Sequence, residues 1–270
     1  MKIRTIASLA FSSVTLVASA NNYADALAGW AFGSRAAFEI AVTAWLGAHG
    51  LDQTTIVEPT GINPSNVSTA SDLVKIGTLA LANPVVSQIV STRSMTLAGV
   101  GNLKNTNTLL GNSGVEGIKT GTLNGSSNLL FAAKYSYGSH SVTVVGAVIG
   151  ATDHGAVDAT VTTLLAGFKA GFHEITLAEK GQSFANFTTA WAQKVRAVST
   201  KSASVLVWSN TPVRAVTSAL PIRVGQRTDL AGMVTFTVGA QSVRLPLALD
   251  HRLVDPGPWW RLGNPAKFLG

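Results

Sequence analysis

Two short motifs in this chain contain residue types that could carry out acyl transfer. Ser19-Ala20-Asn21 supplies a hydroxyl and an amide, and Lys119-Thr120-Gly121 supplies an ammonium group, a second hydroxyl and a residue without a side chain. Acyl transfer needs a hydroxyl that attacks a carbonyl, a base that takes its proton, a proton donor for the leaving amine and hydrogen-bond donors for the oxyanion. The two motifs are therefore candidates for parts of one site.

Context favours the first Ser-x-Asn over a second copy at Ser126-Ser127-Asn128. The first copy lies between two predicted helices, 6–18 and 23–32, whereas the second lies in the turn after Lys-Thr-Gly, where serine and asparagine are ordinary turn residues. Taken singly, Ser19 and Asn21 could merely cap a helix, Lys119 could be a solvated strand lysine and Gly121 could be a bulge. The order and spacing of the motifs favour a site.

Helical periodicity dominates the first third of the chain. Residues 34–46 predict a helix that is capped by Ser34 and buries a stripe of apolar side chains: Phe38, Val42, Trp45 and Leu46. Residues 69–82 predict a further helix, capped by Ser68 and stopped by Asn83-Pro84. These helices precede Lys119, so the first motif belongs to a helical region.

Strand periodicity follows. Residues 115–122, 129–135 and 141–151 predict an antiparallel meander, with Asn124-Gly125 as its first turn, and residues 153–170 predict a helix that covers one face of it. From about residue 172, short β-rich runs such as 205–208, 213–216 and 234–238 predict an all-β domain. We therefore expect an α+β fold with two domains, residues 1–171 and 172–270.

Composition excludes several classes of site. The chain has no cysteine, and its five histidines fall into no metal-ligand spacing, so we expect no metal and no cofactor. The net charge is +7, and residues 171–270 hold 11 Lys and Arg against 5 Asp and Glu. A basic surface favours an anionic polymer or a membrane face, or simply keeps the protein soluble. No basic run is interleaved with aromatic residues, so we expect no nucleic-acid partner.

The chain resembles D-alanyl-D-alanine carboxypeptidases of the serine-type penicillin-binding superfamily in three stretches, 19–28, 59–73 and 105–122. The middle stretch, Pro-Thr-Gly-Ile-Asn-Pro-Ser-Asn-Val-Ser-Thr-Ala-Ser-Asp-Leu, is distinctive well beyond the short motifs. The resemblance covers about residues 1–170 and implies a β-lactamase/transpeptidase-like domain. It further implies the D-Ala-D-Ala stem peptide of peptidoglycan as substrate, β-lactams as ligands, and a secreted or cell-envelope location.

The same resemblance implies roles for the two motifs. Ser19 would lie in the proton path to the departing D-alanine, and Lys119 would relay protons and attract the terminal carboxylate of the substrate. Both are the predicted catalytic residues.

Four further residues would bind the substrate. Asn21 would hold its amide, Thr120 would hydrogen-bond its terminal carboxylate, and Gly121 would let the peptide approach the strand closely. The backbone N–H of Thr122 would be an oxyanion donor, so its side chain matters less. The exposed edge of this strand would align the peptide as an added strand.

One motif of the family is missing. Its Ser-x-x-Lys, which carries the nucleophile, precedes Ser-x-Asn, but no lysine of this chain has a serine three places before it. The resemblance therefore implies an N-terminally truncated chain that neither hydrolyses peptide nor forms a penicilloyl adduct. The strands that normally flank the last strand of the sheet would be absent too, which leaves residues 142–149 as an uncovered, aggregation-prone edge.

Alternatives remain. Met1-Lys2-Ile3-Arg4, followed by an apolar run and Ala18-Ser19-Ala20, has the layout of a signal sequence whose cleavage would remove Ser19. The protein could be a non-catalytic wall-binding scaffold that docks through its basic β domain, or a serine β-lactamase, although residues 59–73 favour a carboxypeptidase. Asp153-His154 suggests a catalytic triad, but no Gly-x-Ser-x-Gly supports one, and we assign the pair no role.

Overall fold

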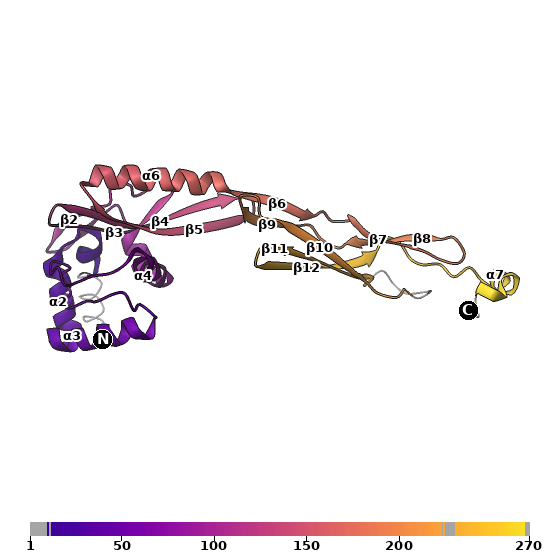
Figure 1. The fold of residues 1–270 in the computed structure, drawn as a ribbon, viewed down its shortest axis with the longest axis horizontal. Helices are drawn as coiled ribbons and strands as arrows, with labels where there is room; N and C mark the ends of the chain where they lie inside the picture. The colour runs from indigo at the N-terminus through magenta and orange to yellow at the C-terminus, as the bar shows by residue number, and fades with distance from the viewer. Residues whose placement is uncertain (1–9, 11, 223, 225–229, 268–270) are drawn as a thin grey trace. The chain divides into compact units, whose positions relative to one another are not determined.

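The computed structural model describes residues 10, 12–222, 224 and 230–267. The chain divides into two compact units. Figure 1 shows the elements of both, coloured by residue number. The first unit is Met1–Ser136 with Ser141–Lys169, and the second is Tyr137–His140 with Ala170–Gly270. The charged start of the possible signal sequence, residues 1–4, lies outside the described residues.

Helices form the first part of the first unit. Residues 12–17 are helical, and four further helices follow: α2 (Asn21–Phe32), α3 (Arg35–Ala48), α4 (Ala70–Ala82) and α5 (Pro84–Val90). Ser34 caps α3 as predicted, because its Oγ accepts from the backbone N–H of Ala37 at 3.1 Å. The predicted cap of α4 was wrong by one residue: Thr69 accepts from the N–H of Asp72, while Ser68 bonds to the hydroxyl of Thr54.

The predicted buried stripe of α3 is only partly correct. Leu46 is buried, but Phe38 and Val42 are half-buried and Trp45 is 40% exposed. Phe38 packs edge-to-face on Phe32 and lines a large cavity, and Trp45 stacks on His49 at the helix surface with ring centroids 4.3 Å apart. The predicted helix was therefore correct, but the spacing of its apolar residues could not show how tightly each of them would pack.

A three-stranded meander, confirmed by the structure, forms the second part of this unit. Asn124 and Gly125 both have positive φ, 52° and 76°, as a two-residue hairpin turn requires. The strand order is β3-β4-β5, and a separate two-stranded hairpin, β1-β2, precedes it. The bounds are β1 (Ser94–Leu97), β2 (Gly101–Lys104), β3 (Val115–Leu123), β4 (Ser126–Tyr137) and β5 (His140–Ala151).

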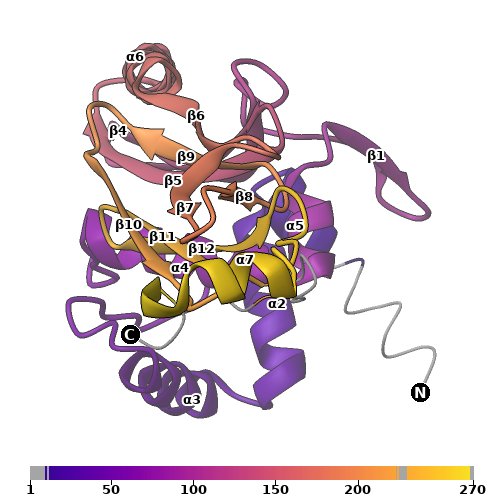
Figure 2. The ribbon, with the colours of Figure 1, turned by 90° about the vertical axis from the view of Figure 1, so that its right-hand side faces the viewer.

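Helices cover both faces of this sheet. Helix α6 (His154–Gly171) lies along β4 and β5 in Figures 1 and 2, and its buried side chains are Val157, Val161 and Leu165. Helix α4 packs on the other face at Gly77, where a Cβ would come within 3.1 Å of Ile118, Val145 and Leu130. Glycine at this position therefore brings α4 into direct contact with all three strands.

The second unit is built mainly from β-strands. A five-stranded sheet has the order β10-β11-β12-β8-β7, and β6 pairs with β9 in a second sheet. Its core includes Val234, Leu245 and Leu247, all nearly inaccessible to solvent. The elements are β6 (Phe172–Ala178), β7 (Ser183–Thr188), β8 (Lys194–Ser199), β9 (Ala203–Trp208), β10 (Val213–Ala219), β11 (Gly232–Val238), β12 (Gln241–Leu249) and the short helix α7 (Pro258–Gly263).

No single described helix is long and apolar enough to cross a membrane. Helices α4 and α5 together meet that criterion of length and composition, but the chain bends by 107° between them.

Strand β5 lies at the end of the strand order in the described part of the chain, so one of its backbone edges is unpaired. It is 12 residues long and carries no Asp, Glu, Lys or Arg. We expect the protein to self-associate through this edge at high concentration. Thr143→Lys, which adds a charge to an exposed position of β5, should reduce this association in concentration-dependent light scattering. Thr163→Lys on the exposed surface of α6 adds the same charge, and an equal reduction there would attribute the effect to net charge instead.

Candidate active site

Ser19 lies at the junction between the helical segment 12–17 and α2. Its φ of 54° is left-handed, an uncommon conformation for a residue with a side chain. This backbone conformation ends one helical segment and lets α2 begin at Asn21. Strained backbone of this kind often occurs at functional sites.

Lys119 reaches this junction from β3. Its Nζ donates to Ser19 Oγ and to the carbonyl oxygen of Thr120, the latter at 2.6 Å. Burial lowers the pKa of the Lys119 ammonium from 10.5 to about 8. Near pH 8 the group can therefore exchange between an ammonium, which donates a proton, and a neutral amine, which accepts one.

Asn21 is the first residue of α2 and connects it to the loop after α3. With its amide nitrogen turned toward them, Asn21 donates to the carbonyl oxygens of Thr60 and Ser19, at 3.2 and 3.3 Å. Asn21, the predicted substrate-binding residue, therefore also holds the loop at Thr60 in place.

The two threonines of β3 have different partners. Thr120 is buried, 8% exposed, and its hydroxyl lies 2.6 Å from that of Thr106. Thr122 is exposed, and its hydroxyl lies 2.9 Å from Nε2 of His154, the first residue of α6. Only one of the two hydroxyls, that of Thr122, is therefore well exposed.

Gly121 lies between them with free space beside it. A Cβ at this position would meet nothing closer than Asn128 at 3.8 Å, so no contact with the described residues requires glycine. The space beside Gly121 belongs to a cavity, which agrees with a close approach of a ligand to the strand.

A cavity of about 490 Å³ brings all six predicted site residues together. Ser19 and Asn21 come from one side and residues 119–122 of β3 from another, while Pro59, Thr60, Gly61 and Ile62 form a third wall. Of the described residues that line it, the titratable ones are Lys119 and His154, and none is a carboxylate. No group of three His, Asp or Glu side chains in the described part of the chain could hold a metal ion.

A buried carboxylate holds the third wall in place. Glu58 is 9% exposed and accepts hydrogen bonds from the backbone N–H groups of Thr60, Gly61 and Asn63, at 2.8, 2.8 and 3.2 Å. The side chains of Thr60 and Asn66 donate to it as well. Burial alone would raise the pKa of Glu58, but these hydrogen bonds lower it to about 2.

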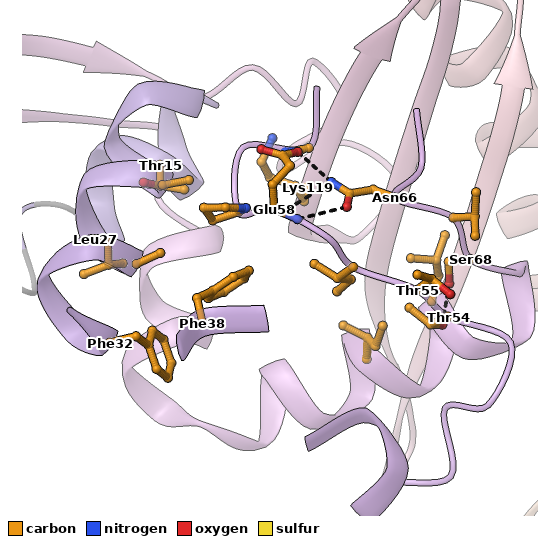
Figure 3. A pocket seen from close by; sticks show the side chains of 18 of the residues that line it. Thr15, Leu27, Phe32, Phe38, Thr54, Thr55, Glu58, Asn66, Ser68 and Lys119 are labelled. Atoms are coloured by element: carbon orange, nitrogen blue, oxygen red, sulfur yellow. Dashed lines mark hydrogen bonds between the residues drawn. The ribbon is translucent and has the colours of Figure 1, made fainter. Parts of the chain in front are cut away.

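A second, larger cavity of about 890 Å³ adjoins the first and shares five lining residues with it: Thr15, Ala24, Pro59, Gly61 and Lys119. Figure 3 shows Leu27, Phe32 and Phe38 on one side of it and the dashed bond between Glu58 and Asn66 on another. One wall is made of apolar side chains of α2 together with Phe38 of α3, and the segment 54–68 with Leu73 and Ile76 of α4 makes another. Lys119 therefore borders both the polar and the mainly apolar cavity.

Sequence reasoning did not assign four contributors to this site. Thr106 and Asn66 lay within the quoted stretches but received no role, and Glu58 directly precedes the distinctive stretch at 59–73. His154 was considered only as a triad member. The signal that could have identified it is its position at the end of the predicted sheet, beside the start of the covering helix.

Comparisons with known proteins show the family to which the chain belongs. Residues 5–152, more than half of the chain, match the D-alanyl-D-alanine carboxypeptidase family. The D-alanyl-D-alanine endopeptidase of Escherichia coli K12 is 38% identical over 80 residues, 30% of this chain and 26% of that protein. Its namesake from Pseudomonas aeruginosa is 35% identical over 119 residues, 41% of this chain and 38% of that protein. Each alignment thus spans well under half of the relative's length.

Solved structures share the fold. PBP3 from Streptococcus pneumoniae, described as a peptidoglycan synthesis regulatory factor, superposes with a TM-score of 0.61 at 20% identity and covers 90% of this chain and 77% of its own. A point mutant of the Streptomyces K15 DD-transpeptidase superposes with a TM-score of 0.52 at 26% identity, covering 59% of this chain and 66% of its own. With its α+β architecture and its Ser-x-Asn and Lys-Thr-Gly motifs in one groove, this chain belongs to the D-alanyl-D-alanine carboxypeptidase family.

Proposed function

We propose that the 490 Å³ cavity binds the D-alanyl-D-alanine end of peptidoglycan stem peptides, outside the cytoplasm at the cell envelope. One observation carries this proposal: Ser19, Asn21 and residues 119–122 line a single cavity although a hundred residues separate the two motifs. β-Lactams, which the family also binds, would occupy the same space.

The edge of β3 is suited to hold an extended peptide. In the strand order β3-β4-β5, β3 has one unpaired edge among the described residues. A peptide added along this edge gains main-chain hydrogen bonds, while the cavity selects its side chains. The Lys119 ammonium supplies positive charge, and the backbone N–H of Thr122 serves as a donor to the carbonyl that would be attacked.

The family's chemistry is acyl transfer through a serine nucleophile. In these 270 residues no serine stands three places before a lysine. We therefore propose that this polypeptide binds the stem peptide without forming an acyl-enzyme. The contact between Lys119 and Ser19 fits a proton path that lacks its nucleophile.

Mass spectrometry tests this proposal. Incubation with a β-lactam should leave the mass of the intact protein unchanged, because no activated nucleophile attacks the strained amide. A separate sample without β-lactam, titrated with an N-acylated peptide that ends in D-Ala-D-Ala, should bind it, whereas the L-Ala-L-Ala diastereomer should not bind. A stoichiometric adduct would contradict the proposed inactivity, and an adduct on Ser19 would identify the Ser19–Lys119 pair as reactive. Equal affinity for both diastereomers would contradict the proposed ligand.

A scaffold role has its own supporting observation. Arg214 on β10 and Arg244 on β12 pair with Thr237 and Thr235 of β11, so both arginines lie on the same face of the sheet. Both are exposed. We propose this face as the contact for an anionic wall polymer. Sedimentation with peptidoglycan that survives Lys119→Ala but is lost with Arg214→Glu and Arg244→Glu would favour the scaffold over the groove.

A further inference from the structure

We propose that the larger cavity binds the hydrocarbon tail of a long-chain carboxylate, such as a fatty acid, whose head group pairs with the Lys119 ammonium. This inference goes beyond the proposed function, because it assigns a second ligand to the 890 Å³ cavity, whereas the stem peptide is proposed for the 490 Å³ cavity. All the residues that line the larger cavity belong to the first unit.

The shape of the cavity suits a hydrocarbon chain. Its volume of about 890 Å³ lies within the range of pockets that enclose a small organic ligand, about 300–1,000 Å³. Ala24, Leu27, Ala28 and Ala31 have the spacing of one face of a helix, and this face of α2 lines the cavity. Three of the four are alanines, so the face is apolar but leaves room for a chain beside it.

Large apolar side chains around the cavity are exposed. Trp30 and Phe32 of α2, Val67 and Ile149 of β5 all line it, and each is between 44% and 53% exposed. Single exposed apolar residues are ordinary on a protein surface, but a group that surrounds one cavity is typical of a binding groove. A hydrocarbon chain in the cavity would remove this surface from water, which favours binding.

Lys119 gives the cavity a charged end. An ammonium can donate three hydrogen bonds, and the described residues accept two of them, at Ser19 Oγ and at the Thr120 carbonyl. No described carboxylate contributes to its pKa, which burial alone lowers. One N–H and the positive charge are therefore available to an anion. Figure 3 shows Leu27 and Phe38 on one side of the cavity and Lys119 on another.

Glu58 does not compete for this cation. Among the described residues that line the cavity, Glu58 and Lys119 are the charged ones. The Glu58 carboxylate accepts its hydrogen bonds from its own loop, from the backbone of residues 60, 61 and 63 and from the side chains of Thr60 and Asn66. These donors hold the pKa of Glu58 at about 2 and offset its negative charge.

The two features together select an amphiphile. An uncharged hydrocarbon would leave the Lys119 ammonium desolvated without a partner, and a small anion would leave the apolar walls in contact with water. A carboxylate joined to an alkyl chain satisfies both, because a charge-assisted hydrogen bond forms at one end while the tail fills the cavity. An apolar helix of another protein would cover the same walls, but it would not need the cation.

Calorimetric titration with decanoate and with 1-decanol, both below the concentrations at which they self-associate, tests the inference. We expect decanoate to bind about tenfold more tightly than the alcohol, because only the carboxylate pairs with Lys119. Octanoate should bind about fifteenfold more weakly than decanoate, since each buried methylene changes the affinity about fourfold. Lys119→Met should bring the ratio of decanoate to decanol close to one and leave the affinity for decanol within about twofold.

Two variants of α2 show which cavity the ligand occupies. Ala31→Trp adds a large ring at a position that lines only the larger cavity. It should weaken the binding of decanoate at least about tenfold and leave the affinity for a D-Ala-D-Ala peptide within about twofold. Ala26→Trp places the same ring on the same helix at a position that lines neither cavity, and it should change neither affinity. Both alanines are exposed, so we expect both variants to fold, which circular dichroism checks.

The inference and the proposed function can fail separately. If the peptide does not bind, the proposed function fails, and the decanoate titrations still decide this inference. Absence of decanoate binding to the unmodified protein would overturn the inference while the proposed function stands. Equal affinity for decanoate and decanol would overturn it too, and would indicate an uncharged occupant such as an apolar helix of another protein. Equal weakening by Ala31→Trp and Ala26→Trp would show that decanoate binds outside the cavity, which also contradicts the inference.

Discussion

Lys119→Met should abolish measurable binding of a D-Ala-D-Ala peptide and, at pH 7, raise the free energy of unfolding. The loss of binding follows from the position of the ammonium between Ser19 and the Thr120 carbonyl, where it supplies the positive charge of the groove. We expect the affinity to fall at least a hundredfold, which corresponds to about 2.7 kcal/mol. Calorimetry with the peptide measures this loss.

The gain in stability follows from desolvation. Burial lowers the pKa of Lys119 from 10.5 to about 8, so keeping the folded protein charged below pH 8 costs roughly 3 kcal/mol. Methionine has a similar shape and no charge, but it loses two hydrogen bonds of about 1 kcal/mol each. The net gain should therefore be about 1 kcal/mol, measured by urea denaturation.

The pH dependence checks the cause. Between pH 8 and 10.5 the unfolded chain binds more protons at Lys119 than the folded one, so the stability of the unmodified protein rises with pH. The advantage of Lys119→Met should therefore shrink over that window and be lost above it. Lys134→Met changes an exposed lysine of β4 and should show neither effect. A difference that stays constant from pH 7 to pH 10.5 would refute desolvation as its origin.

Glu58→Ala should lower the free energy of unfolding by about 3 kcal/mol. The change removes the buried acceptor that the backbone N–H groups of Thr60, Gly61 and Asn63 share, in a loop that is otherwise half-buried or exposed. Residues 59–62 form one wall of the groove, so the affinity for the peptide should also fall. Urea denaturation and calorimetry measure the two effects, and Glu39→Ala on the exposed face of α3 is the matched control.

Acid titration isolates the carboxylate itself. The pKa of Glu58 is lowered from 4.5 to about 2, so its contribution to stability is complete above pH 4.5 and is lost as the pH falls toward 2. Glu58→Gln cannot ionise and should lose this part of the acid dependence. If the unmodified protein and Glu58→Gln weaken in parallel between pH 4.5 and pH 2, the loop is held by other contacts.

The juxtaposition of Ser19 and Lys119 was predicted from the order of the two motifs and from the resemblance of the stretches 59–73 and 105–122 to the carboxypeptidase family, because the residue types alone also fit a helix cap and a solvated lysine. It predicted the meander as well, since Asn124-Gly125 and the alternation around it leave few other arrangements. Strands β7 and β8 were missed because short runs such as Lys-Val-Arg-Ala-Val-Ser mix charged and small residues and give a weak signal.

The division of labour between Thr120 and Thr122 could not be predicted from the sequence. Both hydroxyls lie on the same strand, two residues apart, so the alternation of the strand predicts the same burial for both. Their difference comes from Thr106, which precedes β3, and from His154, which follows β5. Tertiary structure brings these partners to β3, so the pattern of residues within the strand could not predict them. The same reason applies to Glu58, whose donors come from the loop that it organises.

The Glu58 loop and the bond from Asn21 to the Thr60 carbonyl have a consequence for recognition. Together they hold the backbone of the groove rigid before any ligand arrives, so binding should require little ordering of the protein. A rigid groove selects ligands by their shape. It should bind peptides with larger side chains poorly, because widening the groove would break the hydrogen bonds between the loop and the Glu58 carboxylate. Its selectivity is thus tied to the acid stability of the fold, and both should fail at the same low pH.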